Sequence, residues 1–340
     1  DVGGGAGGGD VGGGAVGGDV GGGAGGGAGV DCNTVPLDAA LGTLALRSGA
    51  TVQTFNHLTV DIVAVGAVGT QLYGVTSGNV LHHLGALGAT GATLTAGPAI
   101  STLGPNDTGA VVFAGQYVAT TTSRVLTGYT RSDLSGSVFI YDTTDGGTSH
   151  LEASGNYTAS NLGETWAVNG LALGTANGGA ALYALDDTGP FTLSTFPASV
   201  SSGYTATTGD GVLIAGYADS NFVNQLYAVS PDTVATALDT RSPFTLTTTQ
   251  SLALSSTDGI AGLAATQQAA VLLRSVAWVP VRVEQLALTA SGGGVAVGAV
   301  VPLLERVDTC TSLLFVAGVS DGVLVGVEDR AGARLVKVTP

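Results

Sequence analysis

The chain has 340 residues, of which 56 are glycine and 44% are hydrophobic, and its 25 acidic residues outnumber 10 basic residues to give a net charge of −15. This charge argues against nucleic acid and against anionic membrane surfaces as partners, because both are bound through clustered Lys and Arg. No segment has the sustained apolar character of a membrane-spanning helix, so insertion into a membrane is not expected.

The first thirty residues are three near-copies of a nine-residue unit, DVGGG followed by four Gly, Ala or Val. Each copy begins with an Asp followed by a Val: Asp1 and Val2, Asp10 and Val11, Asp19 and Val20. Because nine is a multiple of three, the repeat stays in phase on a polyproline-II or polyglycine-II helix. A β-strand would turn each successive repeat to the opposite face, although shorter pieces of strand remain an alternative.

Residues 1–31 are therefore expected to form a Gly-rich extension with a function of its own. Gly loses more freedom on ordering than any other residue, so such a segment should become ordered only through contact with another copy of the chain. We expect its subunit-contact residues to be Asp1, Val2, Asp10, Val11, Asp19, Val20 and Val30. The alternative is a flexible Gly-rich spacer.

The two cysteines, Cys32 and Cys310, lie where the extension ends and thirty residues before the last residue. The chain starts at Asp1 and contains no Met, which predicts a processed product that is extracellular or displayed on the cell surface. In that oxidising compartment a Cys32–Cys310 disulfide is expected to fasten the root of the extension to the last part of the domain. Two buried free thiols are the alternative.

Residues 32–340 are expected to form an all-β domain. A loose unit recurs in which an apolar strand, a Gly-containing turn and a strand around Leu-Tyr follow one another. It is found at residues 62–84, 137–154, 170–196, 211–239, 269–289 and 312–340. Tyr73, Tyr183 and Tyr227 take equivalent places in it, and the step of 44 residues from Tyr183 to Tyr227 suits a four-stranded blade.

Local signals inside these units are those of hairpins. Asp-Gly pairs at positions 145, 210, 258 and 321 predict tight turns beside apolar runs. A helical period is seen over Leu37–Arg47 alone. The chain is therefore expected to be almost wholly β.

This layout resembles that of the β-propeller repeat proteins over about 300 residues. The resemblance implies a toroid of six or seven blades, closed by pairing of an N-terminal strand with the last blade, and it implies no activity. The irregular spacing between residues 84 and 137 and between residues 240 and 295 keeps a pair of β-sandwiches or a β-helix as structural alternatives.

The search for chemistry is mostly negative. The four histidines occur in no metal-binding motif, and no serine lies in a nucleophile elbow. The sequence thus predicts neither an enzyme nor a cofactor, with calcium as the one candidate cation. Its candidate ligands are two close pairs of carboxylates, Asp142 with Asp145 and Asp186 with Asp187.

Two functional hypotheses follow, and a third, a secreted hydrolase or lyase on a propeller, has no constellation of residues to support it. The first is a structural subunit of an extracellular filament, in which the extension of one copy docks into a neighbouring copy, head to tail. Its partners would be other copies of the chain. The second is a secreted or surface-tethered propeller that binds a glycan or a protein through its loops.

Overall fold

The computed structural model describes residues 31–35, 44–56, 58, 61–76, 80–88, 94, 99–102, 111–114, 119–120, 124–131, 136–142, 150–155, 162–168, 171–176, 181–186, 189–195, 200–219, 224–246, 251–253 and 258–340. The chain divides into two compact units, Asp1–Val30 and Asp31–Pro340, and the described residues all belong to the second. The predicted contact residues Asp1, Val2, Asp10, Val11, Asp19, Val20 and Val30 lie outside the described residues.

The described strands form six sheets. The first sheet contains β3 (Ile62–Val68), β4 (Gln71–Thr76), β5 (Val80–Ala86) and β6 (Ala99–Thr102). The second contains β7 (Val111–Ala114), β8 (Ala119–Thr120), β9 (Arg124–Arg131), β10 (Gly136–Asp142) and β11 (His150–Gly155). The third contains β12 (Leu162–Val168), β13 (Leu171–Ala176), β14 (Ala181–Asp186), β15 (Gly189–Thr195) and β19 (Phe244–Thr245).

The other three sheets follow in chain order. The fourth sheet contains β16 (Val200–Thr207), β17 (Leu213–Asp219), β18 (Asn224–Val229) and β20 (Ser251–Ala253). The fifth contains β21 (Asp258–Ala265), β22 (Ala269–Val276), β23 (Val279–Ser291), β24 (Gly294–Arg306) and β1 (Leu44–Leu46). The sixth contains β25 (Ser312–Val319), β26 (Gly322–Asp329), β27 (Gly332–Thr339) and β2 (Thr51–Thr54).

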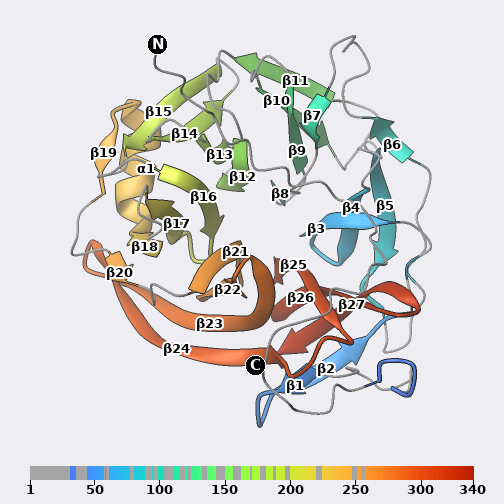
Figure 1. Cartoon of the computed structure of the whole chain (residues 1–340). Helices are drawn as coiled ribbons and strands as arrows, with labels where there is room; N and C mark the ends of the chain where they lie inside the picture. The colour runs from blue at the N-terminus through green and yellow to red at the C-terminus, as the bar shows by residue number, and fades with distance from the viewer. Residues whose placement is uncertain are drawn as a thin grey trace, which may run out of the picture. The chain divides into compact units, whose positions relative to one another are not determined.

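One strand of each sheet faces the centre of a ring (Figure 1). Strand β3 contacts β8, β8 contacts β12, β12 contacts β16, β16 contacts β21, β21 contacts β25, and β25 returns to β3. Sheets that meet in a closed cycle through their inner strands define a β-propeller. The prediction of an all-β propeller is confirmed, and the sandwich pair and the β-helix are not observed.

The ring is closed by the N-terminal strands. Strand β2 pairs with β27 and so becomes the outer strand of the sixth sheet, the closure that the propeller resemblance implied. Strand β1 pairs with the end of β24 and becomes the outermost strand of the fifth sheet. The N-terminal segment therefore joins the outer edges of two neighbouring sheets.

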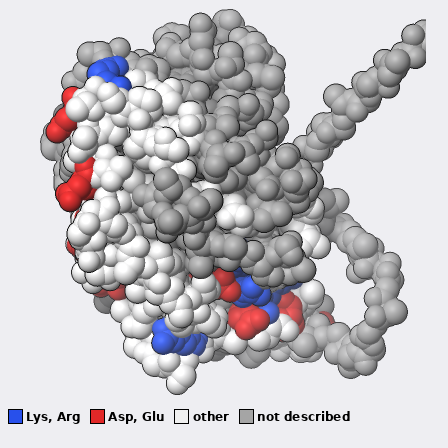
Figure 2. Space-filling view, turned by 90° about the vertical axis from the view of Figure 1, so that its left-hand side faces the viewer, with Lys and Arg blue, Asp and Glu red and all other residues white. Residues whose placement is uncertain are grey.

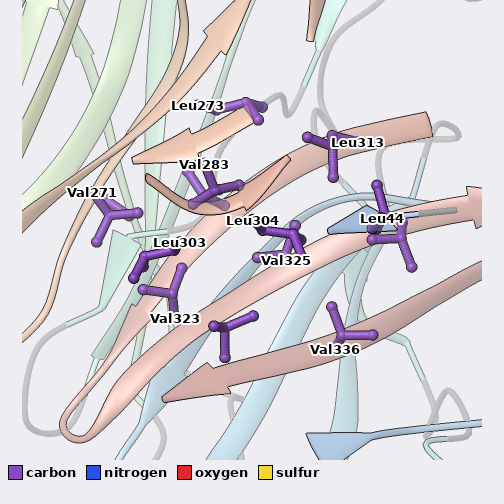
Figure 3. Close-up of a cluster of buried hydrophobic side chains, with 14 residues drawn as sticks. Leu44, Val271, Leu273, Val283, Leu303, Leu304, Leu313, Val323, Val325 and Val336 are labelled. Carbon is purple, nitrogen blue, oxygen red and sulfur yellow. The ribbon is translucent and has the colours of Figure 1, made fainter. Parts of the chain in front are cut away.

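Hydrophobic side chains fill the spaces between neighbouring sheets. One buried cluster lies between the fifth and sixth sheets and includes Val271, Leu273, Val323 and Val325 (Figure 3). Similar clusters lie between the fourth and fifth sheets and between the sixth and first sheets. Because successive side chains of a strand point to opposite faces, one apolar strand such as β22 contributes side chains to the hydrophobic clusters on both faces of its sheet.

Two local predictions are confirmed and three are wrong. The Asp-Gly pairs at 210 and 321 form turns, with Gly211 at a φ of 86°, whereas Asp258 and Gly259 lie in β21. The predicted repeat is displaced by one strand in the first sheet, because Tyr73 lies on its second strand while Tyr183 and Tyr227 lie on third strands. The described end of the expected helix, Leu44–Leu46, is strand β1.

A helix that the sequence reading missed follows β18. Helix α1 spans Pro231–Thr240, with Ser230 as its N-cap and Pro231 in its first turn. The Ser230 hydroxyl accepts a hydrogen bond from the Thr233 backbone N–H at 3.3 Å. Val234 and Ala237 are the buried residues of α1. No helix among the described residues is long and apolar enough to cross a membrane.

Candidate functional site

Residues 31–35, which follow the Gly-rich extension and are here called its root, are bonded covalently to a later part of the propeller chain. Cys32 and Cys310 form a disulfide with their Cα atoms 5.1 Å apart, which confirms the predicted pairing. Cys310 lies in the connection between β24 and β25, where the chain passes from the fifth sheet to the sixth. A disulfide of this kind indicates an oxidising environment.

Both halves of the disulfide lie in turns that an Asp begins. On one side, Asp31 Oδ1 accepts hydrogen bonds from the backbone N–H and the side-chain amide of Asn33, at 3.0 and 3.1 Å. On the other side, Asp308 Oδ1 accepts from the Cys310 N–H at 2.8 Å. Asp side chains stabilise such turns by replacing a backbone acceptor. The cysteines are thus presented to each other by local structure.

The sixth sheet holds the same segment from its other side. Arg330, in the turn between β26 and β27, donates from Nη1 to the carbonyl of Asn33 and from Nη2 to the carbonyl of Val35, the latter at 3.1 Å. The Ala331 N–H donates to Asp329 Oδ1 at 2.8 Å and shapes this turn. The planar guanidinium suits two carbonyl acceptors at once. The root is therefore attached to two sheets by two independent sets of bonds.

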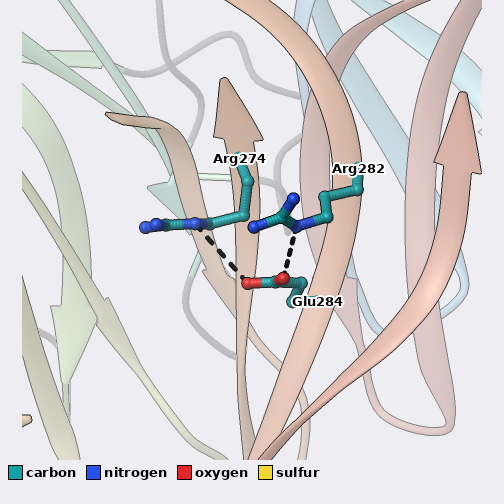
Figure 4. A network of polar contacts seen from close by, with 3 residues as sticks. All are labelled: Arg274, Arg282 and Glu284. Carbon is teal, nitrogen blue, oxygen red and sulfur yellow. Dashed lines mark hydrogen bonds and ion pairs between the residues drawn. The ribbon is translucent and has the colours of Figure 1, made fainter. Parts of the chain in front are cut away.

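Buried or partly buried ion pairs lie within the fifth sheet and within the sixth sheet. Arg274 is 2% exposed, and its Nε lies 3.5 Å from Glu284 Oε2, while Arg282 donates from Nε to Glu284 Oε1 (Figure 4). The register pairs Arg274 with Arg282 on neighbouring strands, so one carboxylate stands between two guanidinium groups. In the sixth sheet, Arg334 Nη2 lies 3.4 Å from Asp329 Oδ2.

An exposed tryptophan lies at the tip of the hairpin between β22 and β23. Trp278 is 83% exposed, and both Trp278 and Ala277 have positive φ angles, 69° and 47°. A two-residue turn with positive φ at both positions normally uses Asn or Gly, because a side chain is strained there. The sequence reading missed this residue, since Ala-Trp is no turn signal.

The candidate calcium ligands are only partly described. Asp142 is the last residue of β10 and pairs with Arg124, and Asp186 is the last residue of β14 and pairs with Gly189. Their proposed companions Asp145 and Asp187 lie outside the described residues. Over the described part of the chain, no three His, Cys, Asp or Glu residues are grouped to hold a metal ion.

The sequence matches no protein-family model and no curated protein, whereas the fold matches solved structures well. The PQQ-bound aldose sugar dehydrogenase of Streptomyces coelicolor is similar, with a TM-score of 0.57 and 11% identity over 87% of this chain and 99% of that chain. The PQQ domain of a pyranose dehydrogenase from Coprinopsis cinerea has a TM-score of 0.53, 10% identity, and coverage of 87% and 97%. A putative glucose dehydrogenase of Thermus thermophilus has a TM-score of 0.53, 11% identity, and coverage of 85% and 100%. The chain shares their fold.

These likenesses correct the prediction that the chain is not an enzyme. The proteins named above are dehydrogenases or a putative one, so the fold that this chain shares with them is one that enzymes use. The prediction rested on missing local motifs. The absence of local motifs is not evidence against an enzyme, because a site on a propeller can combine residues from several blades that are far apart in the sequence.

The prediction that no cofactor except calcium is expected is corrected in the same way, since two of the similar structures are named for PQQ. PQQ bears several carboxylates and needs cationic side chains around it. Most of the described basic side chains already contact groups of the protein itself: Arg274, Arg282, Arg306, Arg330, Arg334 and Lys337 in polar contacts, and Arg241 over the Phe191 ring. These contacts leave few of the described basic side chains to hold the carboxylates of such a group.

Proposed function

We propose that this chain is an extracellular structural protein whose propellers are linked into a filament by the Gly-rich N-terminal extension. The observation that carries the proposal is the Cys32–Cys310 disulfide, which makes the extension a covalent part of the ring at its root. A segment that served only as a spacer would not need a disulfide at the point where it joins the domain. An attached segment transmits force to the ring.

The surroundings of the disulfide support this mechanical role. A pull on the extension would reach the fifth sheet through Cys310 and the sixth sheet through Arg330. It would then reach β1 and β2, whose hydrogen bonds to β24 and β27 must shear before the ring opens. The force on the extension would thus be shared between the fifth and sixth sheets, which suits a subunit of a filament.

The extension is long enough to reach a neighbour. Thirty residues at roughly 3.1 Å each span about 90 Å when extended. An extension that docks on a different surface of the next copy makes a head-to-tail contact, which grows without closing. Copies of this chain are thus the proposed partners, and the cell exterior is the proposed location.

The test compares the full chain with a variant in which residues 1–30 keep their composition but lose the nine-residue register. The wild type should sediment as growing oligomers as its concentration rises, and the shuffled variant should remain a monomer with the same far-ultraviolet spectrum. A monomeric wild type at every concentration would refute the proposal. Equal assembly of both chains would refute the role of the repeat.

A second candidate is a propeller that binds another molecule through its loops, and Trp278 favours it. A side chain that is 83% exposed in a strained turn has the aromatic character of an interface anchor. The same sedimentation experiment separates the candidates, since a binding module should remain monomeric.

A further inference from the structure

Strand β24 of the fifth sheet has an outer edge that is mostly unpaired among the described strands. Strand β24 has 13 residues, yet β1 pairs only with Leu304–Arg306, and the Arg47 N–H adds one bond to the Leu303 carbonyl at 2.9 Å. Among the described strands, none pairs with residues 294–301 on the side away from β23, although β18 of the fourth sheet contacts β24. Such an edge presents main-chain donors and acceptors to any chain that approaches.

This edge lacks charge and proline, two of the features by which proteins normally protect an exposed strand. Its sequence from Gly294 to Val301 is GVAVGAVV, with no charge and no proline, and Val297 and Val300 are each 38% exposed. Pro302 stands at the boundary between this bare run and the part that β1 covers. Natural edges are usually short, or carry Lys or Pro, because they otherwise pair with other chains.

A bulge interrupts the pairing of this run with β23. The register shifts between Leu286 and Leu288, so that Gly298 and Ala299 stand opposite Ala287 alone. A Gly and an Ala therefore lie at the irregular position. Figure 2 shows the left-hand side of Figure 1 as a described surface that is mostly uncharged, with acidic side chains along one margin and a group of basic and acidic side chains low in the view.

We propose that residues 294–301 of β24 accept the Gly-rich extension of a second copy as an added strand. This inference rests on the proposed function and identifies its acceptor site. Main-chain hydrogen bonds would supply the affinity, and Gly, Ala and Val on both strands would let the backbones approach closely. One nine-residue repeat matches the eight residues of the bare run, so a single repeat fills one edge.

The register of the added strand has a candidate determinant in Arg47. This residue is exposed in the turn after β1, and its N–H bonds Leu303 at the end of the bare run. Each repeat of the extension begins with an Asp and contains no basic residue. An Asp of the extension beside Arg47 would set the position of the repeat while adding little to affinity.

The test replaces the two exposed valines of the edge. In the full chain, Val297→Lys with Val300→Lys should raise the concentration needed for assembly at least about tenfold, equivalent to about 1.4 kcal/mol. The matched control, Val276→Lys, changes an equally exposed valine of the same sheet away from the edge and should assemble like the wild type. Equal assembly of the double variant and the control would overturn the inference while leaving the proposed function standing.

Hydrogen exchange supplies a readout that does not depend on these variants. The amides of residues 294–301 should exchange quickly in dilute wild-type protein and become protected as the concentration rises. Quick exchange in assembled protein would overturn the inference. Protection that does not change with dilution would also overturn it, because the occupant would then be the extension of the same copy.

If the wild type does not assemble, a labelled peptide of residues 1–30 decides the matter separately. Binding of this peptide to the wild type, with loss in the double variant and retention in the control, would uphold the edge as an acceptor even though the proposed function had failed. Lack of binding would overturn both.

Discussion

Cys32 and Cys310 are 278 residues apart in the sequence, and the loop that their disulfide closes contains the strands from β1 to β24, whereas β25, β26 and β27 follow it. The same ring is also closed by hydrogen bonds between β2 and β27. The covalent closure and the hydrogen-bonded closure act at different places, one in the connection before β25 and one at the outer edge of the sixth sheet. The N-terminal segment that follows the extension is therefore fixed at two separate points.

Removing the disulfide should destabilise the propeller. Replacing Cys32 and Cys310 together by Ser should lower the free energy of unfolding by about 2–5 kcal/mol, because the unfolded chain regains the entropy of a very long loop. Chemical denaturation of the wild type and the double variant measures this difference. An unchanged midpoint would mean that the β2–β27 pairing alone sets the stability of the ring.

Glu284 should be more costly to remove alone than together with its partner. Glu284→Gln leaves two guanidinium groups around a neutral amide in a buried place, and should cost about 3–5 kcal/mol. Arg274→Met combined with Glu284→Leu removes the buried pair, and should recover more than half of that loss. Denaturation midpoints of both variants test this, and a double variant less stable than the single one would contradict it.

The turn at Ala277 and Trp278 should become more stable when residues suited to positive φ replace them. Ala277→Asn with Trp278→Gly should raise the free energy of unfolding by about 1 kcal/mol, because Asn and Gly adopt these angles with less strain. Thermal and urea denaturation give the comparison. A less stable variant would show that contacts of the indole outweigh the strain of the turn.

Asp321 and Lys337 form a pair whose effect depends on pH. Lys337 Nζ donates to Asp321 Oδ2 at 2.7 Å, and this hydrogen bond lowers the pKa of Asp321 from its usual 3.8. A lowered carboxyl pKa stabilises the folded state at pH values above the unfolded pKa, and this stabilisation is lost as the pH falls through the folded pKa. Because Asp321 is mostly exposed, the gain should be below about 1 kcal/mol.

Carboxyl titration by nuclear magnetic resonance measures that pKa directly. In Lys337→Met the Asp321 pKa should return toward 3.8. On acidification this variant should unfold at a slightly higher pH than the wild type. Glu305→Gln, at an exposed carboxylate of the fifth sheet, is a control that should leave the Asp321 pKa unchanged. An unchanged Asp321 pKa in Lys337→Met would show that the lysine is not its cause.

Much of the fold could be predicted because its signals are local. Alternating apolar strands and Asp-Gly turns such as Asp210-Gly211 and Asp321-Gly322 are encoded within a few residues. The disulfide could also be predicted, because a chain with two cysteines in an oxidising compartment has only one intramolecular pairing to form. Helix α1 was missed although Ser230 and Pro231 signal its start, because ten residues with two buried side chains leave a weak period.

The parts that could not be predicted depend on contacts distant in sequence. Nothing near Leu44–Leu46 or Thr51–Thr54 says that these strands pair with β24 and β27, since the partners lie more than 250 residues away. Arg330 likewise appears in the sequence as one more turn residue, and only the fold brings it to the carbonyl of Val35. The unpaired edge of β24 can be recognised only from the structure, in which pairing with β1 stops at Leu304.

Electron microscopy of the full chain in negative stain, under non-reducing conditions, tests the central claim most directly. The account predicts rings joined in rows that lengthen with protein concentration, and separate rings when the register of residues 1–30 is shuffled. Separate rings of the wild-type chain at every concentration would contradict it.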